Sequence, residues 1–272
     1  MSLPVIPKKS LGQNFLTSDR VVTRIIDAAH LTKKDTVLEI GPGLGAITQK
    51  LLLAAGTVVA VEKDTNLFEL LSEKFSTEIT SGNLQLVHDD VLNIHPESFQ
   101  KKSDGSYIVA ANIPYNITGL IIRKFLSEHH QPKRMVLLIQ KEVADRILAR
   151  DNKESLLSLS VKVYGTPKLV TNVSRGNFNP APRVDSAVIA IENISKKNVP
   201  NQKFEELFFK IIHAGFAHKR KILIKNMVDT EIAEREMLEK IFEKRNLLPT
   251  IRAEDLSLDD WLFITNILYN TQ

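Results

Sequence analysis

Over residues 17–140, short apolar runs alternate with segments whose apolar residues recur at helical spacing. The apolar runs lie at 36–40, 57–62, 84–88, 107–113 and 134–140, and helical segments are predicted at 17–30, 46–56, 65–75 and 118–129. Strands that alternate with helices of this length are typical of a parallel sheet with helices on both faces. We therefore predict an α/β fold with a doubly wound, mostly parallel, Rossmann-like sheet.

After residue 140 the alternation becomes less regular. The segment 141–150 has a helical pattern, 156–165 fits either a helix or a strand, and 185–193 is predicted to be a strand. The polar segment 195–202 contains a proline and is predicted to link two domains. Amphipathic helical patterns without a strand candidate follow at 204–216, 233–245 and 258–269. The predicted domains are residues 1–194 and a small all-helical domain, 195–272.

Composition narrows the class of protein. The chain has 272 residues, of which 43% are apolar, and it contains no cysteine. The lack of cysteine excludes a thiolate nucleophile and a Cys-ligated zinc, and it fits a reducing compartment such as the cytoplasm. No apolar run approaches 18 residues and no charged-then-apolar leader is present, so we expect neither a membrane span nor a secretory signal. We expect a monomer.

Positive charge is concentrated in residues 196–225. The whole chain has a net charge of +4, but this stretch alone carries eight Lys or Arg against Glu205 and Glu206, a net +6 that leaves −2 elsewhere. Clustered cations of this kind suit a phosphate backbone. A solvated helix face with scattered lysines explains the charge about equally well.

A glycine-rich turn follows the predicted strand 36–40. Gly41, Gly43 and Gly45 allow a tight turn and let a ligand approach the backbone at the start of the next helix. Glu62, 21 positions after Gly41, ends the next predicted strand, where a carboxylate can accept hydrogen bonds from both ribose hydroxyls. A nucleoside-containing cofactor is indicated. The turn fits a nicotinamide dinucleotide and S-adenosylmethionine equally, because G-x-G-x-x-A also satisfies the looser dinucleotide pattern.

The tetrapeptide NIPY ends the predicted strand 107–113. The side-chain oxygen of Asn112 can accept a hydrogen bond from an amino group, Pro114 can turn the carbonyl of Ile113 toward the same point, and Tyr115 offers a flat face for a base. The exocyclic amine of adenine is a poor nucleophile because its lone pair is delocalised. Two acceptors would favour a tetrahedral nitrogen that can attack a sulfonium methyl, which is catalysis by positioning and electrostatics.

These residues fall within motifs that together resemble one family. The motifs are KKSLGQNFL at 8–16, LEIGPGLGAIT at 38–48, VEKD at 61–64, ANIPYNIT at 110–117, FNPAPRVDSAV at 178–188 and FAHKRKILIKNM at 216–227. In this order they resemble the ribosomal RNA adenine dimethylases, most closely the small-subunit adenine dimethyltransferases of the bacterial KsgA type. The resemblance extends over essentially the whole chain. It implies transfer of methyl groups from S-adenosylmethionine to two adjacent adenines of small-subunit rRNA during ribosome biogenesis.

The resemblance also implies residue roles, none of them in a metal site. The residues implied to contact the cofactor are Gln13, Asn14, Leu16, Gly41, Gly43, Glu62, Lys63, Asp90, Val91 and Asn112. Those implied at the target base are Asn112, Ile113, Pro114, Tyr115 and Phe178, with the base extruded between the rings of Tyr115 and Phe178. Lys219, Arg220 and Lys221 are implied to contact RNA. The sequence has HDD where a Gly-Asp pair is expected, so either Asp89 or Asp90 fits as the adenine ligand.

Several alternatives remain at this stage. The macrolide-resistance methylases of large-subunit rRNA share a similar NIPY motif and fold, although YNIT and the basic KRKIL segment favour the small-subunit type. A non-catalytic nucleic-acid-binding factor on the same scaffold is a second alternative. A DNA adenine methylase and a nicotinamide dehydrogenase fit less well, because the first more often has two prolines before the tyrosine and the second needs an acid–base group beside the turn.

Overall fold

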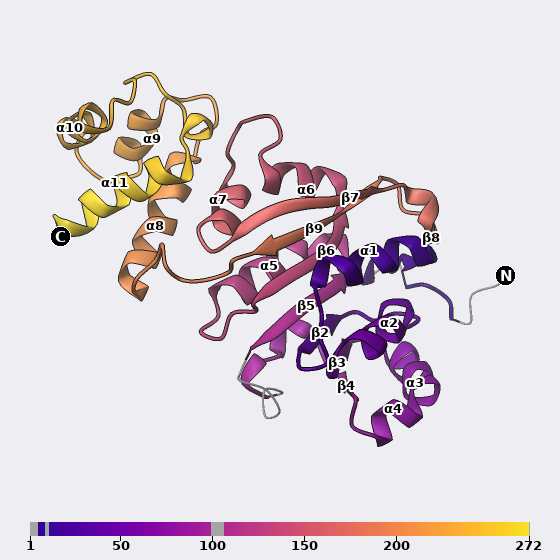
Figure 1. Ribbon diagram of the computed structural model, residues 1–272. Coiled ribbons are helices and arrows are strands. Elements are labelled where there is room, and N and C mark those ends of the chain that lie inside the picture. The colour runs from indigo at the N-terminus through magenta and orange to yellow at the C-terminus, as the bar shows by residue number, and fades with distance from the viewer. Residues whose placement is uncertain (1–4, 9–10, 99–105, 272) are drawn as a thin grey trace. The chain divides into compact units, whose positions relative to one another are not determined.

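The computed structural model describes residues 5–8, 11–98 and 106–271 and divides the chain into two compact units (Figure 1). The first unit comprises Met1–Ala144 and Thr166–Ile194, and the second comprises Asp145–Gly165 and Ser195–Gln272. A boundary after residue 194 is also the one that the sequence analysis proposes. The segment 145–165 differs, because the sequence analysis assigns it to the first domain.

The segment 145–165 belongs to the second unit through specific contacts. The N–H of Glu154 donates to the carbonyl of Glu254 at 2.8 Å, and the N–H of Ser195 donates to the carbonyl of Tyr164 at 2.8 Å. The ring of Tyr164 stacks on Phe209. A sequence pattern does not reveal these long-range contacts.

A mixed sheet forms the centre of the first unit. Within the described residues it has seven strands, ordered β4-β3-β2-β5-β6-β9-β7. The strands are β2 (Thr36–Ile40), β3 (Thr57–Glu62), β4 (Leu84–His88), β5 (Tyr107–Asn112), β6 (Arg134–Gln140), β7 (Thr166–Val173) and β9 (Ser186–Glu192). The first five are mutually parallel, and β9 runs antiparallel to both β6 and β7. A two-residue pairing of β1 (Phe15–Leu16) with β8 (Phe178–Asn179) forms a separate small sheet.

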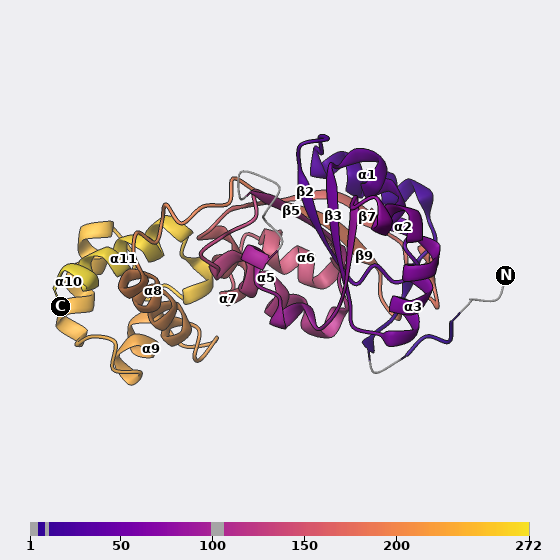
Figure 2. The ribbon, with the colours of Figure 1, turned by 90° about the horizontal axis from the view of Figure 1, so that it is seen from below.

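Helices cover this sheet, as the alternation predicts. They are α1 (Asp19–Ala29), α2 (Ala46–Ala54), α3 (Thr65–Lys74), α4 (Ser76–Thr80) and α5 (Thr118–Ser127). The helix α6 (Lys141–Leu148) begins in the first unit and crosses the boundary after Ala144. Buried residues of α1 and α2, with Leu71 of α3, form one apolar cluster with Val37 and Val58 of the sheet. Figure 2 shows α5 on the opposite side of the sheet from α1. The predicted α/β fold is confirmed.

Among its described residues, the second unit has helices and no strand. Its helices are α7 (Leu156–Lys162), α8 (Gln202–Gly215), α9 (Leu223–Asp229), α10 (Arg235–Arg245) and α11 (Leu258–Asn270). Trp261 of α11 is fully buried, and a Cβ added at Gly215 of α8 would lie 2.3 Å from its ring. Only glycine therefore permits this approach of α8 to the tryptophan. Among the described helices, none is long and apolar enough to cross a membrane.

Candidate active site

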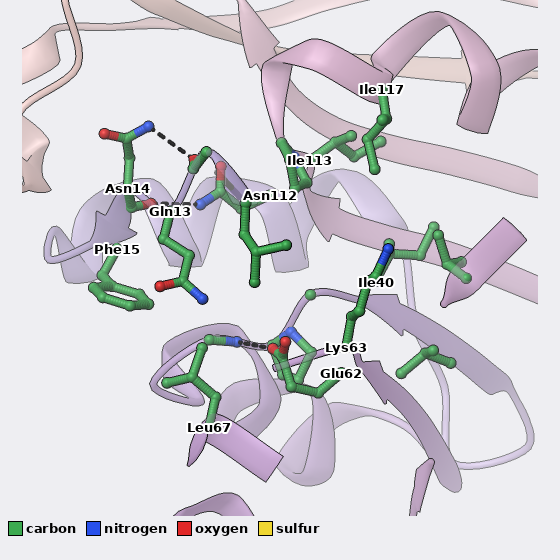
Figure 3. A pocket seen from close by; sticks show the side chains of 18 of the residues that line it. Gln13, Asn14, Phe15, Ile40, Glu62, Lys63, Leu67, Asn112, Ile113 and Ile117 are labelled. Atoms are coloured by element: carbon green, nitrogen blue, oxygen red, sulfur yellow. Dashed lines mark hydrogen bonds between the residues drawn. The ribbon is translucent and has the colours of Figure 1, made fainter. Parts of the chain in front are cut away.

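A pocket opens where the parallel strands end. It is lined by the residues that follow β2, β3, β4 and β5, at 40–44, 61–63, 89–92 and 112–117, and by an N-terminal segment, 11–16 (Figure 3). The carboxyl ends of β2, β3 and β5 meet here because these strands are parallel neighbours in register. A crevice outside the carboxyl ends of parallel strands is where open α/β sheets bind ligands.

The glycine turn is part of the lining of this pocket. Gly41 and Gly43 have φ values of +63° and +59°, in the left-handed region that disfavours other residues. A Cβ added at Gly43 would lie 3.1 Å from the ring of Phe15, so the turn also has little room for a side chain. The N–H of Gly41 donates to the carbonyl of Val61 at 3.0 Å, which ties the turn to the end of β3. The turn thus presents bare backbone to a ligand.

Glu62 is the last residue of β3 and lies beside this turn. Its side chain accepts hydrogen bonds from the N–H of Asp64 at 2.8 Å and from the N–H of Gly43 at 3.3 Å, one at each oxygen. Burial raises the pKa of Glu62, and these N–H groups partly offset that rise. A carboxylate offers about four lone-pair positions, so both oxygens keep capacity for a pair of ligand hydroxyls. The predicted position of Glu62 in a nucleoside site is therefore supported by its geometry.

Asp89 and Asp90 both line the pocket after β4. The Asp90 carboxylate accepts from the N–H of Leu92 at 2.9 Å and pairs with the Lys63 ammonium at 2.8 Å. Hydrogen bonds from Lys63 and Leu92 lower the pKa of Asp90. One oxygen of Asp89 accepts from the N–H of Asp90 at 2.6 Å. The choice between the two as adenine ligand stays a prediction. Val91, buried, also lines the pocket.

Asn112 is the last residue of β5 and contacts the N-terminal segment. Its side-chain NH₂ donates to the backbone carbonyl of Asn14 at 3.1 Å, as Figure 3 shows. This contact fixes the orientation of the amide, because only its nitrogen can donate. The side-chain oxygen is then the remaining acceptor. Next in the chain, Ile113 is buried and Pro114 holds φ at −55°, and both line the same pocket.

Tyr115 begins the short 3₁₀ turn after Pro114 and is half-buried at the pocket. Its hydroxyl makes a 2.7 Å hydrogen bond with the hydroxyl of Ser186, the fully buried first residue of β9. Burial raises the pKa of the tyrosine, so the phenol stays neutral. Ser186 lies outside the described lining of the pocket and reaches it only through Tyr115, and its residue type did not single it out in the sequence. The signal for it is weak, a hydroxyl at the start of an apolar strand.

Phe178 does not lie in the pocket. It is 5% exposed, pairs with Leu16 across β1 and β8, and packs in the apolar cluster with Val22 and Val173. The described lining of the pocket does not include it. The family resemblance implies that this ring lies beside the target base. The ring packs in the core, and its role beside a target base stays a prediction.

Glu39 is a second buried acid near the site but outside its described lining. It lies in the middle of β2 and is 1% exposed, and among the described residues neither of its oxygens has a well-formed hydrogen bond. Burial raises its pKa to about 8, although the neighbouring Thr48 hydroxyl and N–H oppose the rise. Glu39 is therefore largely protonated at neutral pH and does not add to the charge of the site.

The basic residues predicted to contact RNA lie in the second unit, in a turn between α8 and α9. Lys219 and Arg220 are exposed, whereas Lys221 pairs with Asp229 at 3.2 Å. The side chain of Asn226, itself fully buried, donates to the carbonyls of Gly215 at 2.6 Å and His218 at 3.1 Å. Asn226 thereby fixes the shape of the turn. Among the described residues, no group of acidic and histidine side chains could hold a metal ion.

Comparison with known proteins identifies the family. The family profile described as ribosomal RNA adenine dimethylase matches residues 7–270. The chain belongs to this family. The match spans both units, so the helical unit is part of the family's common structure and not an addition. The resemblance found in the sequence motifs is confirmed.

Curated relatives carry one recurring name, ribosomal RNA small subunit methyltransferase A. The protein of that name from Dehalococcoides mccartyi (strain CBDB1) is 41% identical over 254 residues, which cover 93% of this chain and 86% of the relative. The one from Clostridium botulinum (strain Okra / Type B1) is 36% identical over 264 residues, 96% of this chain and 94% of the relative. The similarity therefore extends over nearly the full length of both proteins.

Two solved structures share the fold over nearly the whole chain, both units included. A dimethyladenosine transferase from Plasmodium falciparum has a TM-score of 0.77 and 26% identity, covering 94% of this chain and 98% of that one. The 23S rRNA methyltransferase ErmE has a TM-score of 0.76 and 23% identity, covering 94% and 100%. At that identity the second likeness shows the fold alone.

Proposed function

We propose that this family member transfers methyl groups from S-adenosylmethionine to the exocyclic amines of two adjacent adenines in small-subunit rRNA, during ribosome assembly in the cytoplasm. The names of relatives at 36% and 41% identity support the small-subunit substrate. The large-subunit alternative has weaker support, since the structure with that description is 23% identical.

The pocket residues fit the parts of this cofactor. The bare backbone at Gly41 suits the methionine part of the cofactor. The Glu62 carboxylate suits the ribose, because it would accept hydrogen bonds from the ribose hydroxyls. Asp90 or Asp89 would accept from the adenine amino group, and Asn14, whose carbonyl accepts from Asn112, also lines the pocket. When bound, the cofactor supplies an electrophilic methyl on a sulfonium.

The orientation of Asn112 carries the proposal. Because its NH₂ is held by the Asn14 carbonyl at 3.1 Å, its oxygen is the group left to accept a hydrogen from the target amine. With the Ile113 carbonyl as a second acceptor, the amine nitrogen becomes tetrahedral and its lone pair is aligned toward the methyl carbon. With the cofactor bound, this nitrogen would form the new bond to the methyl carbon, the electrons of the broken bond would stay on the sulfur, and the cationic product would lose a proton to water. Each such acceptor contributes roughly 10²–10³ in rate.

Tyr115 completes the site by giving the extruded base a face on which to stack. Its hydroxyl bond to the buried Ser186 would hold the ring at a fixed angle while the base enters. Phe178, implied as the second ring, is 5% exposed, and its stacking on the base remains part of this proposal.

The helical domain, for which we propose residues 195–272 as in the sequence analysis, would bind rRNA outside the pocket. Its turn at 218–221 supports this role, because the side chains of Lys219 and Arg220 are exposed and the buried Asn226 fixes the turn. Exposed cations on a fixed turn can contact phosphates without reading sequence.

The test uses methyl-labelled S-adenosylmethionine with small subunits isolated from cells that lack this modification, and with naked large-subunit rRNA in parallel. We expect label as dimethyladenosine in small-subunit rRNA alone. Label in large-subunit rRNA alone would make the protein a resistance-type enzyme. Bound cofactor without label in either RNA would make it a non-catalytic binding factor.

A further inference from the structure

A buried carboxylate holds one end of the N-terminal pocket wall. Asp64, in the loop between β3 and α3, has a side chain that is 0% exposed. Its Oδ2 accepts from the side-chain NH₂ of Gln13 at 2.8 Å, and its Oδ1 accepts from the Lys8 ammonium at 2.8 Å. The N–H of Lys8 in turn donates to the side-chain oxygen of Gln13 at 2.7 Å. Lys8, Gln13 and Asp64 thus form a closed set of contacts.

The segment 11–16, which we call the arm, spans the pocket between two other loops. At Gly12 a Cβ would lie 3.5 Å from the side chain of Asn116 and 3.7 Å from that of Pro114, so the arm touches the loop after β5. At Gln13 it is bonded to Asp64 in the loop after β3. All six of its residues line the pocket. The arm therefore forms a wall across the crevice.

The two ends of the arm are held differently. At residues 14–16 it is held by the β1–β8 pairing and by the Asn112 bond to Asn14, which involve backbone groups of the arm. At Gln13 it is held by side-chain contacts to Asp64. The bond to Asp64 is therefore the side-chain attachment of the first part of the arm.

The Asp64 carboxylate accepts more hydrogen bonds than the cap of α3 requires. It caps α3, because its Oδ1 accepts from the N–H of Asn66 at 3.0 Å, and an asparagine or serine could also do this. A buried charge costs stability unless it is paired and hydrogen-bonded. Burial alone would raise the pKa of Asp64, but the bonds from Lys8, Gln13 and Asn66 lower it, so the group is ionised at neutral pH. The ionised second oxygen serves the arm and not the cap.

We propose that Asp64 is a positioning residue that closes the arm over the bound cofactor through Lys8 and Gln13, and that the cofactor leaves when these contacts break. The inference rests on the proposed function, since it assigns the pocket to S-adenosylmethionine. Asp64 itself lies outside the described lining of the pocket and acts through the arm.

Two substitutions isolate this role. Asp64→Asn keeps an oxygen for the Asn66 N–H, but it removes the charge facing Lys8 and turns an NH₂ toward Gln13. Lys8→Met removes only the ammonium, from a side chain that is 44% exposed and outside the described lining, so folding is at little risk. Lys168→Met is the matched control, because it also removes a lysine paired with a carboxylate, Glu192 at 2.6 Å, on an edge strand.

The experiment measures the dissociation rate of S-adenosylhomocysteine, with KM for S-adenosylmethionine, kcat and thermal unfolding, for the full-length protein and the three variants. We expect dissociation and KM to rise roughly 10-fold in Asp64→Asn and severalfold in Lys8→Met, with kcat nearly unchanged, as the loss of charge-assisted hydrogen bonds implies. Because the two substitutions break the same set of contacts, the dissociation rate of the double variant should be no higher than that of Asp64→Asn. Lys168→Met should match the wild type.

Wild-type dissociation rates in both Asp64→Asn and Lys8→Met would overturn the inference. So would a lower unfolding temperature in Asp64→Asn without faster dissociation, because that result would leave Asp64 with the helix cap alone. If the wild type bound neither S-adenosylmethionine nor S-adenosylhomocysteine, the proposed function would be rejected, and this inference with it.

Discussion

The charged groups of the pocket and those of the basic turn are held in opposite ways. In the pocket, Glu62 is buried and accepts from two backbone N–H groups, and Asp64 is buried with three donors. In the turn at 218–221, Lys219 and Arg220 are exposed, and Lys221 has a partly exposed partner in Asp229. The pocket residues have fixed positions before any ligand arrives, whereas the cations are available to a ligand in solution.

This difference teaches how each region should respond to perturbation. Interactions between buried groups are little screened by salt, so substitutions in the pocket should act through geometry at any ionic strength. Exposed cations that bind phosphates displace counterions, so their contribution should fall steeply with salt. Substitutions in the two regions, measured at low and high salt, test that contrast.

The largest effect is expected from Asn112→Ala. Loss of the acceptor oxygen should lower the rate of methyl transfer by roughly 10²–10³, with cofactor affinity changed only a few-fold, because Glu62 and the glycine turn stay in place. Single-turnover methylation measures the rate, and calorimetry measures cofactor binding. Transfer at the wild-type rate would mean that the amine is not held by Asn112. The loss should be the same at low and high salt.

A smaller effect is expected from Glu62→Gln, which keeps the shape but leaves one oxygen where the carboxylate had two. Cofactor affinity should fall roughly 10-fold, the scale of one hydrogen bond to a charged group. Calorimetry at two salt concentrations should give the same ratio of affinities to the wild type. If the difference in affinity between Glu62→Gln and the wild type becomes smaller at high salt, Glu62 acts through screened charge and not through its fixed position.

Replacing Lys219, Arg220 and Lys221 together by glutamine should weaken rRNA binding and leave cofactor binding unchanged. We expect the slope of log affinity against log salt to become shallower by about 2–3, since each lost phosphate contact contributes about 0.9. Filter binding over a range of salt measures the slope, and Lys240→Gln on α10 serves as a control for loss of an exposed lysine. An unchanged slope would place the RNA surface elsewhere.

The smallest effect is expected from Ser186→Ala, which removes the partner of the Tyr115 hydroxyl but not the stacking ring. Methyl transfer should slow a few-fold, with unchanged cofactor affinity, because one neutral hydrogen bond is lost. Tyr115→Phe removes the same bond from the other side, so the double variant should be no slower than the slower single variant. Additive losses would show that the two hydroxyls act separately.

The order of elements and the strand-end motifs were predictable from the sequence, but several placements were not. The strand β7 is absent from the sequence prediction because its residues are mostly half-exposed at the sheet edge and form no apolar run. The segment 156–165 fitted both helix and strand, and contacts within the second unit make its first part α7. Asp64 gave only the signal of a residue before a helix, and nothing in VEKD indicates its bonds to Lys8 and Gln13.

By itself, the sequence determined that glycines and polar side chains stand at the carboxyl ends of the predicted strands. Glycines at 41 and 43, the acid at 62 and the amide at 112 must come together once the strands pair in parallel, because all of them follow strand carboxyl ends. Only the tertiary structure decided which way these groups face. The Asn112 amide is oriented by Asn14, 98 residues away, and the ring of Phe178 is drawn into the core by the pairing of β8 with β1. Such contacts depend on the register of distant segments, which local spacing in a sequence does not contain.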